Sequence, residues 1–185
     1  MATLPPLYAH RLGREPGPDS SRAALRATLA GPVHGLETDV CLTGDGRLVL
    51  LHDPWLSTGT TSRGWAHEAE SSELCHARLR DRDGAATNET PMLLDELLDV
   101  APGDLAVQVE ARWGALAGVG GVCIEHFLLH EGLVDRLRLD GLSVTTGTVN
   151  DATLAARAAA LGVDAITTDR PAALCGELAA MLLAA

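Results

Sequence analysis

The sequence predicts one α/β domain built on a mostly parallel β-sheet. Short apolar runs typical of strands alternate along the chain with segments whose residues favour helices. This alternation indicates a parallel sheet covered by helices, either doubly wound or closed as a barrel. A chain of 185 residues, 46% of them hydrophobic, suits one core, so residues 1–185 are expected to form a single domain.

The strands and helices follow from the period of the apolar residues and from the polar residues that bound each run. The expected strands are Leu7–Arg11, Gly35–Leu42, Arg47–His52, Asp104–Ala111, Gly121–Leu129, Leu142–Val149 and Asp164–Thr168. The expected helices are Ser20–Ala30, Ser72–Leu79, Pro91–Val100, Gly132–Asp140, Asp151–Leu161 and Ala172–Leu183.

Turn and capping residues support several of these boundaries. The Asp-Gly pair at 45–46 lies between two apolar runs and predicts a tight hairpin, so the next strand should fold back on the preceding one. Thr90 and Asn150 are expected to be helix N-caps. Gly141 and Gly162 should follow the ends of helices in the left-handed conformation.

The charge balance argues against a nucleic-acid partner. The net charge is −11, and all 14 basic residues are arginines. Nucleic-acid binding takes much of its affinity from basic side chains on phosphates, so this chain is not expected to bind nucleic acid. A small phosphorylated substrate is still compatible, because a local arginine or a metal ion can overcome an unfavourable overall field.

The sequence also bears on location and redox state. The first eight residues lack a basic region followed by an apolar run, so we expect no signal peptide. No stretch approaches 18 uninterrupted apolar residues, so we expect no transmembrane segment and a cytoplasmic location. The four cysteines are far apart and include no Cys-x-x-Cys pair, which favours reduced and mostly buried thiols.

Two carboxylates stand out in the second expected strand, where Glu37 and Asp39 occur in Gly-Leu-Glu-Thr-Asp-Val. Alternate residues of a strand point to the same face, so these two lie about 7 Å apart on one face. They repel each other unless a positive charge lies between them. A hard cation such as Mg²⁺ or Ca²⁺, which prefers oxygen ligands, would supply it. The alternative is a solvent-facing strand that carries two acids.

Three further polar residues close apolar strands. Glu110 ends a run that otherwise reads as buried, and barrel enzymes place working groups at the carboxyl ends of parallel strands. An ordinary strand-end acid is the simpler interpretation. His10 and His52 each end an apolar strand, and histidine is the usual general acid or base near neutral pH. A single strand-end histidine is commonly structural, but two of them beside a carboxylate pair favour a catalytic role.

Read together, these residues resemble the glycerophosphodiester phosphodiesterase family. The family opens with His-Arg-Gly, which appears here as His-Arg-Leu-Gly at residues 10–13. Its block Glu-x-Asp-Val-x-x-Thr-x-Asp-Gly, followed by a strand ending in His-Asp, matches residues 37–46 and 52–53. Later family motifs follow at residues 110–112, 148–150 and 162–171.

The resemblance implies hydrolysis of a glycerophosphodiester to glycerol 3-phosphate and an alcohol, with a divalent metal, Mg²⁺ or Ca²⁺. The residues that it assigns are His10 and His52 as the acid–base pair, Arg11 and Arg112 as substrate contacts, and Glu37, Asp39 and Glu110 as metal ligands. The chain departs from the family where Leu12 replaces a glycine, Arg112 a lysine and Gly147 a tryptophan.

The resemblance also implies a barrel, but the chain is short for one. A complete eight-stranded barrel usually needs about 250 residues, with about 200 as the lower end. Between Arg112 and Gly141 one strand–helix unit is found where the family has three. We therefore expect a TIM-like (βα) barrel shortened by about two units, strands four and five. Such a sheet must close with six strands, stay open or borrow strands, and exposed edges favour a homo-oligomer.

Three other functions stay open. A degenerate barrel could act as a binding or interaction module, which would bind a metal tightly without turnover. A related two-histidine barrel that cleaves phospholipids to a cyclic phosphate fits the His-Arg-Leu opening. A doubly wound domain with an unrelated small ligand is excluded if Glu37, Asp39 and Glu110 converge in space.

Overall fold

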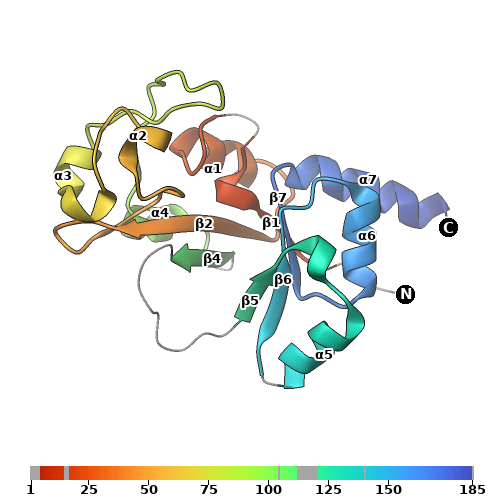
Figure 1. The fold of residues 1–185 in the computed structure, drawn as a ribbon. Coiled ribbons are helices and arrows are strands. Elements are labelled where there is room, and N and C mark those ends of the chain that lie inside the picture. The colour runs from red at the N-terminus through yellow and green to blue at the C-terminus, as the bar shows by residue number, and fades with distance from the viewer. Residues whose placement is uncertain (1–4, 15–16, 104, 112–120, 140, 185) are drawn as a thin grey trace.

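The computed structural model describes residues 5–14, 17–103, 105–111, 121–139 and 141–184, without the side chains of Glu110, Ala111, Val122, Arg136 and Ala184. Seven strands form one curled sheet with helices packed along its outer face (Figure 1). The strands are β1 (Leu7–Ala9), β2 (Gly35–Leu42), β3 (Leu48–Val49), β4 (Ala106–Ala111), β5 (Gly121–Ile124), β6 (Ser143–Thr146) and β7 (Ala165–Thr168).

The larger helices are α1 (Arg22–Leu29), α4 (Leu94–Val100), α5 (Glu131–Leu139), α6 (Ala152–Ala160) and α7 (Pro171–Ala184). Single turns of helix are α2 (Leu56–Gly59), α3 (Ser71–Leu74), η1 (His10–Leu12), η2 (Ala66–Glu68) and η3 (His126–Leu128). Among the described residues, no helix is long and apolar enough to cross a membrane.

The strand order shows that the sheet is an opened barrel. The parallel strands run β4-β2-β1-β7-β6-β5, and only β3 is antiparallel, paired with the end of β2. The first strand thus lies beside the last one, as in a ring, whereas the common doubly wound sheets place their first strand beside the third or the fourth. In the described residues the ring is open between β4 and β5. In the part of the chain that the structure describes, six parallel strands in place of eight confirm the shortened barrel.

Two apolar cores meet at β1. Leu7 packs in a cluster with residues of β6, β7, α6 and α7, including Val144, Ile166 and Leu174. Ala9, two positions later, packs in a second cluster with residues of β2, α1 and α4. Because Leu36 and Val40 of β2 belong to that second cluster, the alternate residues Glu37 and Asp39 lie on the inner face of the half-barrel.

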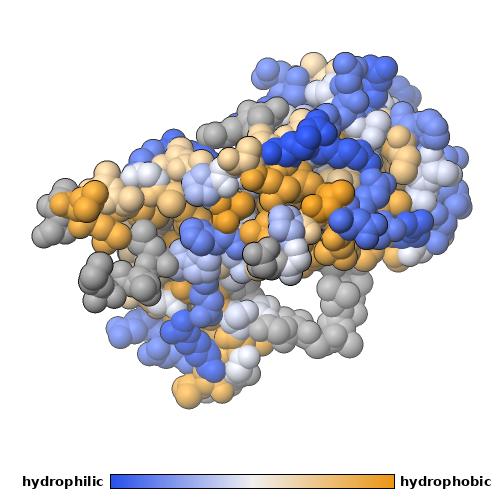
Figure 2. All heavy atoms as spheres, turned by 180° about the vertical axis from the view of Figure 1, so that it is seen from behind, coloured by the Kyte–Doolittle hydropathy of each residue, from blue (hydrophilic) through white to orange (hydrophobic). Residues whose placement is uncertain are grey.

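A third core supports the segment between β3 and α4, here called the arm (residues 53–90). Its buried residues come from the end of β2, from β3 and from the arm's short turns: Cys41, Val49, Leu51, Leu56, Ala66, Leu74, Leu79 and Leu93. Seen from behind, hydrophilic residues dominate the surface at the arm's end of the molecule (Figure 2). At the opposite end, the exposed Leu182 and Leu183 make the tip of α7 apolar.

Several expected boundaries were wrong for local reasons. The first strand ends at Ala9, because Arg11 (φ 49°) and Leu12 (φ 63°) adopt a left-handed turn that no extended strand allows. The expected strands 47–52 and 121–129 shorten to β3 and β5, and the expected helix 72–79 to α3.

The capping residues were identified only in part. Asp151, not Asn150, caps α6, since its carboxylate accepts from the backbone N–H of Leu154. Leu93, not Thr90, precedes α4. The left-handed glycines after α5 and α6 are confirmed, with φ of 79° and 81° at Gly141 and Gly162. None of the four cysteines forms a disulfide, but only Cys41 is buried, whereas Cys75 and Cys175 are half-buried and Cys123 is exposed, so the expectation of mostly buried thiols was wrong.

Hydrogen bonds to the side chain of Asp45 connect the hairpin between β2 and β3 to the arm. Its carboxylate accepts hydrogen bonds from the Ser71 hydroxyl (2.5 Å), the Ser71 backbone N–H (3.0 Å) and the Thr43 hydroxyl (2.6 Å). The side-chain hydrogen bonds from Ser71 and Thr43 lower the pKa of Asp45 from 3.8 to about 2. These bonds favour the ionised carboxylate, so the folded state holds this proton less tightly than the unfolded chain does.

This linkage predicts a pH-dependent stability. A lowered folded-state pKa stabilises the fold above about pH 4, and that contribution is lost as the pH falls toward 2. We expect Asp45→Asn to lower the urea midpoint at pH 6 and to reduce its fall between pH 4 and pH 2.5. The matched control is Asp99→Asn, on the exposed side of α4. An unchanged pH dependence in Asp45→Asn would contradict this account.

Candidate functional site

A polar cavity of about 270 Å³ opens at the carboxyl ends of the parallel strands. It is lined by His10, Arg11, His52, Cys123, Glu125, Gly147, Thr148 and Thr167. Apart from His52, which follows the antiparallel β3, these residues lie at or just after the carboxyl ends of β1, β5, β6 and β7, where barrel enzymes hold their working groups. The structure thus brings both sequence-predicted histidines and Arg11 to one cavity.

His10 is held by the carboxylate of Asp169, a residue that is distant from it in the sequence. Its Nδ1 lies 2.8 Å from Asp169 Oδ1 and 3.2 Å from the Thr148 hydroxyl. Its Nε2 lies 3.9 Å from Glu37 Oε2. A carboxylate only accepts, so the contact with Asp169 places a proton on Nδ1, and Nε2 is the nitrogen that remains for proton transfer.

Asp169 is itself fixed and ionised. Its second oxygen accepts from the Asn150 side-chain amide at 2.7 Å. Burial raises the pKa of Asp169, but hydrogen bonds with His10 and Asn150 and the charges of His10 and Arg14 outweigh burial and lower the pKa from 3.8 to about 2. Asp169 is therefore negative at neutral pH, oriented toward His10, and suited to stabilise a protonated imidazole.

The left-handed turn after β1 explains how Arg11 meets the carboxylates of β2. Its backbone N–H donates to Glu37 Oε2 at 2.9 Å. Its guanidinium donates to Asp19 at 2.6 Å through Nη1, and its Nε lies 3.4 Å from Asp39 Oδ2. The next residue, Leu12, has a positive φ where the family has glycine, and its side chain is fully buried in the β2–α1–α4 core. That burial offsets a backbone cost of about 1–2 kcal/mol.

The sequence-predicted metal ligands belong to two adjacent parallel strands, Glu37 and Asp39 to β2 and Glu110 to β4. Glu37 and Asp39 are buried, with 2% and 1% exposure. The backbone of Glu110 pairs in register with that of Asp39 across the parallel β2–β4 ladder. Buried carboxylates at such positions form a donor set that fits a hard divalent cation.

The metal-ligand assignment remains a prediction. The side chain of Glu110 is not described, and among the described residues no group of three or more His, Cys, Asp and Glu side chains could hold a metal. Arg112, the second expected substrate contact, lies outside the described residues.

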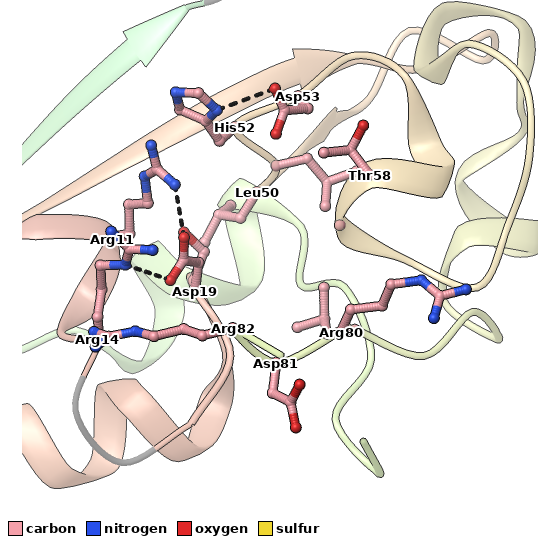
Figure 3. A pocket seen from close by; sticks show the side chains of 14 residues that line it. Arg11, Arg14, Asp19, Leu50, His52, Asp53, Thr58, Arg80, Asp81 and Arg82 are labelled. Atoms are coloured by element: carbon pink, nitrogen blue, oxygen red, sulfur yellow. Dashed lines mark hydrogen bonds and ion pairs between the residues drawn. The ribbon is translucent and has the colours of Figure 1, made fainter. Parts of the chain in front are cut away.

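His52 stands between two cavities. Its Nδ1 lies 3.3 Å from Asp53 Oδ1, and its side chain is 30% exposed. Together with Arg11 it lines the barrel-mouth cavity and also a second cavity of about 140 Å³ on the arm side (Figure 3). A group bound at Arg11 and His52 therefore has access to both cavities.

Asp169, Asn150 and Thr148 were not identified as site residues from the sequence. They belong to the segments 148–150 and 162–171, which match family motifs but from which no catalytic or binding residue was predicted. The missing signal was available: Thr148 and Asn150 follow β6, and Asp169 follows β7, so all three lie at the same end of the sheet as His10.

Comparison with known proteins identifies the family. The sequence pattern of the glycerophosphoryl diester phosphodiesterase family matches residues 10–115 and 105–173. The two matched segments overlap at residues 105–115, close to where the sequence lacks two strand–helix units.

Curated relatives include two glycerophosphodiester phosphodiesterases. The protein of Caldanaerobacter subterraneus subsp. tengcongensis is 28% identical over 116 residues, 62% of this chain and 47% of that protein. The protein of Bacillus altitudinis is 34% identical over 98 residues, 51% of this chain and 39% of that protein. The chain thus spans less than half of the length of these curated relatives.

Solved structures share the fold. A glycerophosphodiester phosphodiesterase of Agrobacterium tumefaciens superposes with a TM-score of 0.76 at 19% identity, covering 94% of this chain and 100% of the other. A phosphodiesterase of Oleispira antarctica, solved with the product sn-glycerol-3-phosphate, gives 0.72 at 20% identity, covering 94% and 96%. With more than half of its residues matched by the family pattern, the chain belongs to the glycerophosphoryl diester phosphodiesterase family.

Proposed function

We propose that this chain hydrolyses a glycerophosphodiester to glycerol 3-phosphate and an alcohol with the help of a divalent metal. The observation that carries the proposal is the single cavity lined by His10, Arg11 and His52 beside the buried Glu37. The activities named for the curated relatives and the glycerol 3-phosphate in the Oleispira structure point to the same substrate class.

Glu37, Asp39 and Glu110 are the residues that would hold Mg²⁺ or Ca²⁺. Carboxylate oxygens suit both cations, and the buried position of Glu37 and Asp39 favours a charge that neutralises them. When bound, such an ion would polarise a phosphoryl oxygen and offset the charge that develops in the transition state.

The two histidines would move the protons. One takes a proton from the attacking oxygen as the new P–O bond forms, and the other gives a proton to the alcohol as the old P–O bond breaks. Asp169 holds the proton on Nδ1 of His10, so that Nε2 performs the transfer. Arg11, with its guanidinium at the edge of both cavities, would contact the phosphate.

The opened ring supports a second proposal, self-association. β4 and β5 each have one neighbour in the described sheet, and unpaired strand edges favour pairing with another chain. A homo-oligomer would cover them, and a monomeric solution mass at all concentrations would argue against it.

A catalytically degenerate binding module stays the alternative to the enzyme, and a cytoplasmic location stays a prediction.

Turnover is the first test of the proposed activity. Wild-type protein should release glycerol 3-phosphate from glycerophosphocholine or glycerophosphoethanolamine with Mg²⁺ or Ca²⁺ but not with EDTA. His10→Ala should lose at least a hundredfold in kcat, because acid–base catalysis contributes roughly 10²–10⁴-fold. His76→Ala, on the exposed surface of the arm, is the matched control. No turnover by folded wild type with any metal would favour the binding module, and a cyclic phosphate seen by phosphorus NMR would favour the phospholipid-cleaving alternative.

Asp169→Asn tests the positioning of His10. An amide keeps the size of the side chain but not its charge, so we expect kcat to fall roughly a hundredfold with little change in KM. The pH profile of kcat should also shift, because the neutral amide no longer stabilises a protonated imidazole. An equal loss in Asn150→Ala with an unchanged pH profile would indicate a merely structural role for Asp169.

Metal binding can be measured without turnover. Calorimetric titration of the metal-free protein with Mg²⁺ or Ca²⁺ should give one site, and Asp39→Asn or Glu110→Gln should weaken it at least tenfold. Glu70→Gln, on the exposed side of the arm, should leave the affinity unchanged. If wild type binds neither cation, or the carboxylate variants bind as wild type does, this ligand assignment is wrong.

A further inference from the structure

The second cavity is unusually basic for this chain. Four arginines line it, Arg11, Arg14, Arg80 and Arg82, against three aspartates, although the chain as a whole carries a net charge of −11. Its remaining walls come from the end of β3, the turn before α1 and the arm, including Leu50, Thr58 and Leu79 (Figure 3). The cavity therefore combines a positive rim with a partly apolar wall.

Asp19 holds two of the arginines side by side. Its Oδ2 accepts from Arg11 Nη1 at 2.6 Å, and its Oδ1 accepts from Arg14 Nε at 2.6 Å. One carboxylate thus fixes two guanidinium groups, and both arginine side chains are at most one quarter exposed. Pre-positioned guanidinium groups can bind an anion at little cost in side-chain entropy.

On the opposite wall of this cavity, backbone carbonyl oxygens of the arm hold the side chain of Arg80. Arg80 donates to the carbonyl oxygens of Thr60 at 2.9 Å and Gly84 at 2.7 Å, which hold its guanidinium pointing away from Arg14 and Arg82 (Figure 3). Asp81 accepts from the backbone N–H groups of Asp83 and Ala85, and its carboxylate points away from Arg14 (Figure 3). The carboxylate of Asp81 is therefore occupied by hydrogen bonds within its own turn.

Arg82 is the arginine with most freedom to bind a ligand. Its side chain is exposed and extends across the cavity toward Arg14 (Figure 3). Within the part of the chain that the structure describes, no hydrogen bond or ion pair engages its guanidinium. A carboxylate or phosphate between Arg82 and Arg14 would meet two guanidinium groups in place of one.

The two cavities share Arg11 and His52, so one molecule can occupy both. On the basis of the proposed function, we infer that the arginine-lined cavity binds the alcohol portion of the phosphodiester and selects alcohols that carry an anionic group. The preferred substrates are then phosphodiesters whose leaving alcohol bears a carboxylate or a second phosphate.

Two matched pairs of esters test this preference. Glycerophosphoserine differs from glycerophosphoethanolamine by one carboxylate, and glycerophosphoglycerol phosphate differs from glycerophosphoglycerol by one phosphate. Wild type should favour the more anionic member of each pair in kcat/KM. Arg82→Gln should reduce that ratio about fivefold, since an exposed ion pair contributes about 1 kcal/mol. Arg63→Gln, which removes an exposed arginine of the arm away from the cavity, should keep the ratio.

A binding measurement separates this inference from the proposed activity. Calorimetric titration with the same esters, in EDTA so that turnover is suppressed, should show the same preference and its loss in Arg82→Gln. The preference should also weaken as salt rises from 50 to 500 mM, because exposed charges are screened. Preferential binding without turnover under any metal would support the arginine subsite and contradict the phosphodiesterase. Turnover with equal preference within both pairs, or a ratio unaffected by Arg82→Gln, would overturn the subsite alone, and absence of both binding and turnover would overturn both.

Discussion

The position of β1 between β2 and β7 is the constraint on which the rest of the structure depends. This strand of three residues pairs in parallel with both neighbours and contributes Leu7 to one core and Ala9 to the other. It is the only strand that joins the β2–β4 half of the described sheet to the β5–β7 half. Any change that weakens β1 therefore separates two apolar cores rather than loosening one.

The candidate site uses the same arrangement. Immediately after β1, His10 turns to Asp169 in one half of the molecule, and the backbone of Arg11 turns to Glu37 in the other half. The left-handed turn at Arg11 and Leu12 takes the chain out of the extended conformation at the point where both contacts are made. Backbone strain at this point is thus tied to the geometry that the chemistry needs.

Much of the fold could be predicted from the sequence, because apolar periodicity and glycine punctuation are local signals. The hairpin at Asp45 and the alternation of Leu36 and Val40 with Glu37 and Asp39 follow from such signals. The shortened barrel was instead implied by the family resemblance together with the chain length. The ends of the strands were harder to predict, because contacts with residues distant in the sequence impose the turn at Arg11. Its backbone N–H donates to Glu37, and its carbonyl oxygen accepts from the backbone N–H of Ser20. Local propensity contains no information about such partners.

The site was predictable to the extent that its residues are chemically conspicuous. His10, His52, Glu37 and Asp39 attract attention because polar residues interrupt apolar strands. Asp169 and Asn150 lie in polar loops, where an acid or an amide is ordinary, and only the sheet topology shows that they meet His10. The same applies to Arg82, which lies in a run of alternating charges that reads as a solvated loop until the arm places it across from Arg14.

The pairing of the first strand with the last also has a consequence for biosynthesis. β1 is synthesised before β2 and can pair with it early, but its other neighbour, β7, is synthesised after all the other strands of the described sheet. The contact between His10 and Asp169 closes a loop of 159 residues, and contacts so distant in sequence form late. A nascent chain thus carries His10 and both carboxylates of β2 without the residue that orients the histidine. The orientation of His10 should consequently be completed only after β7 and Asp169 have been synthesised.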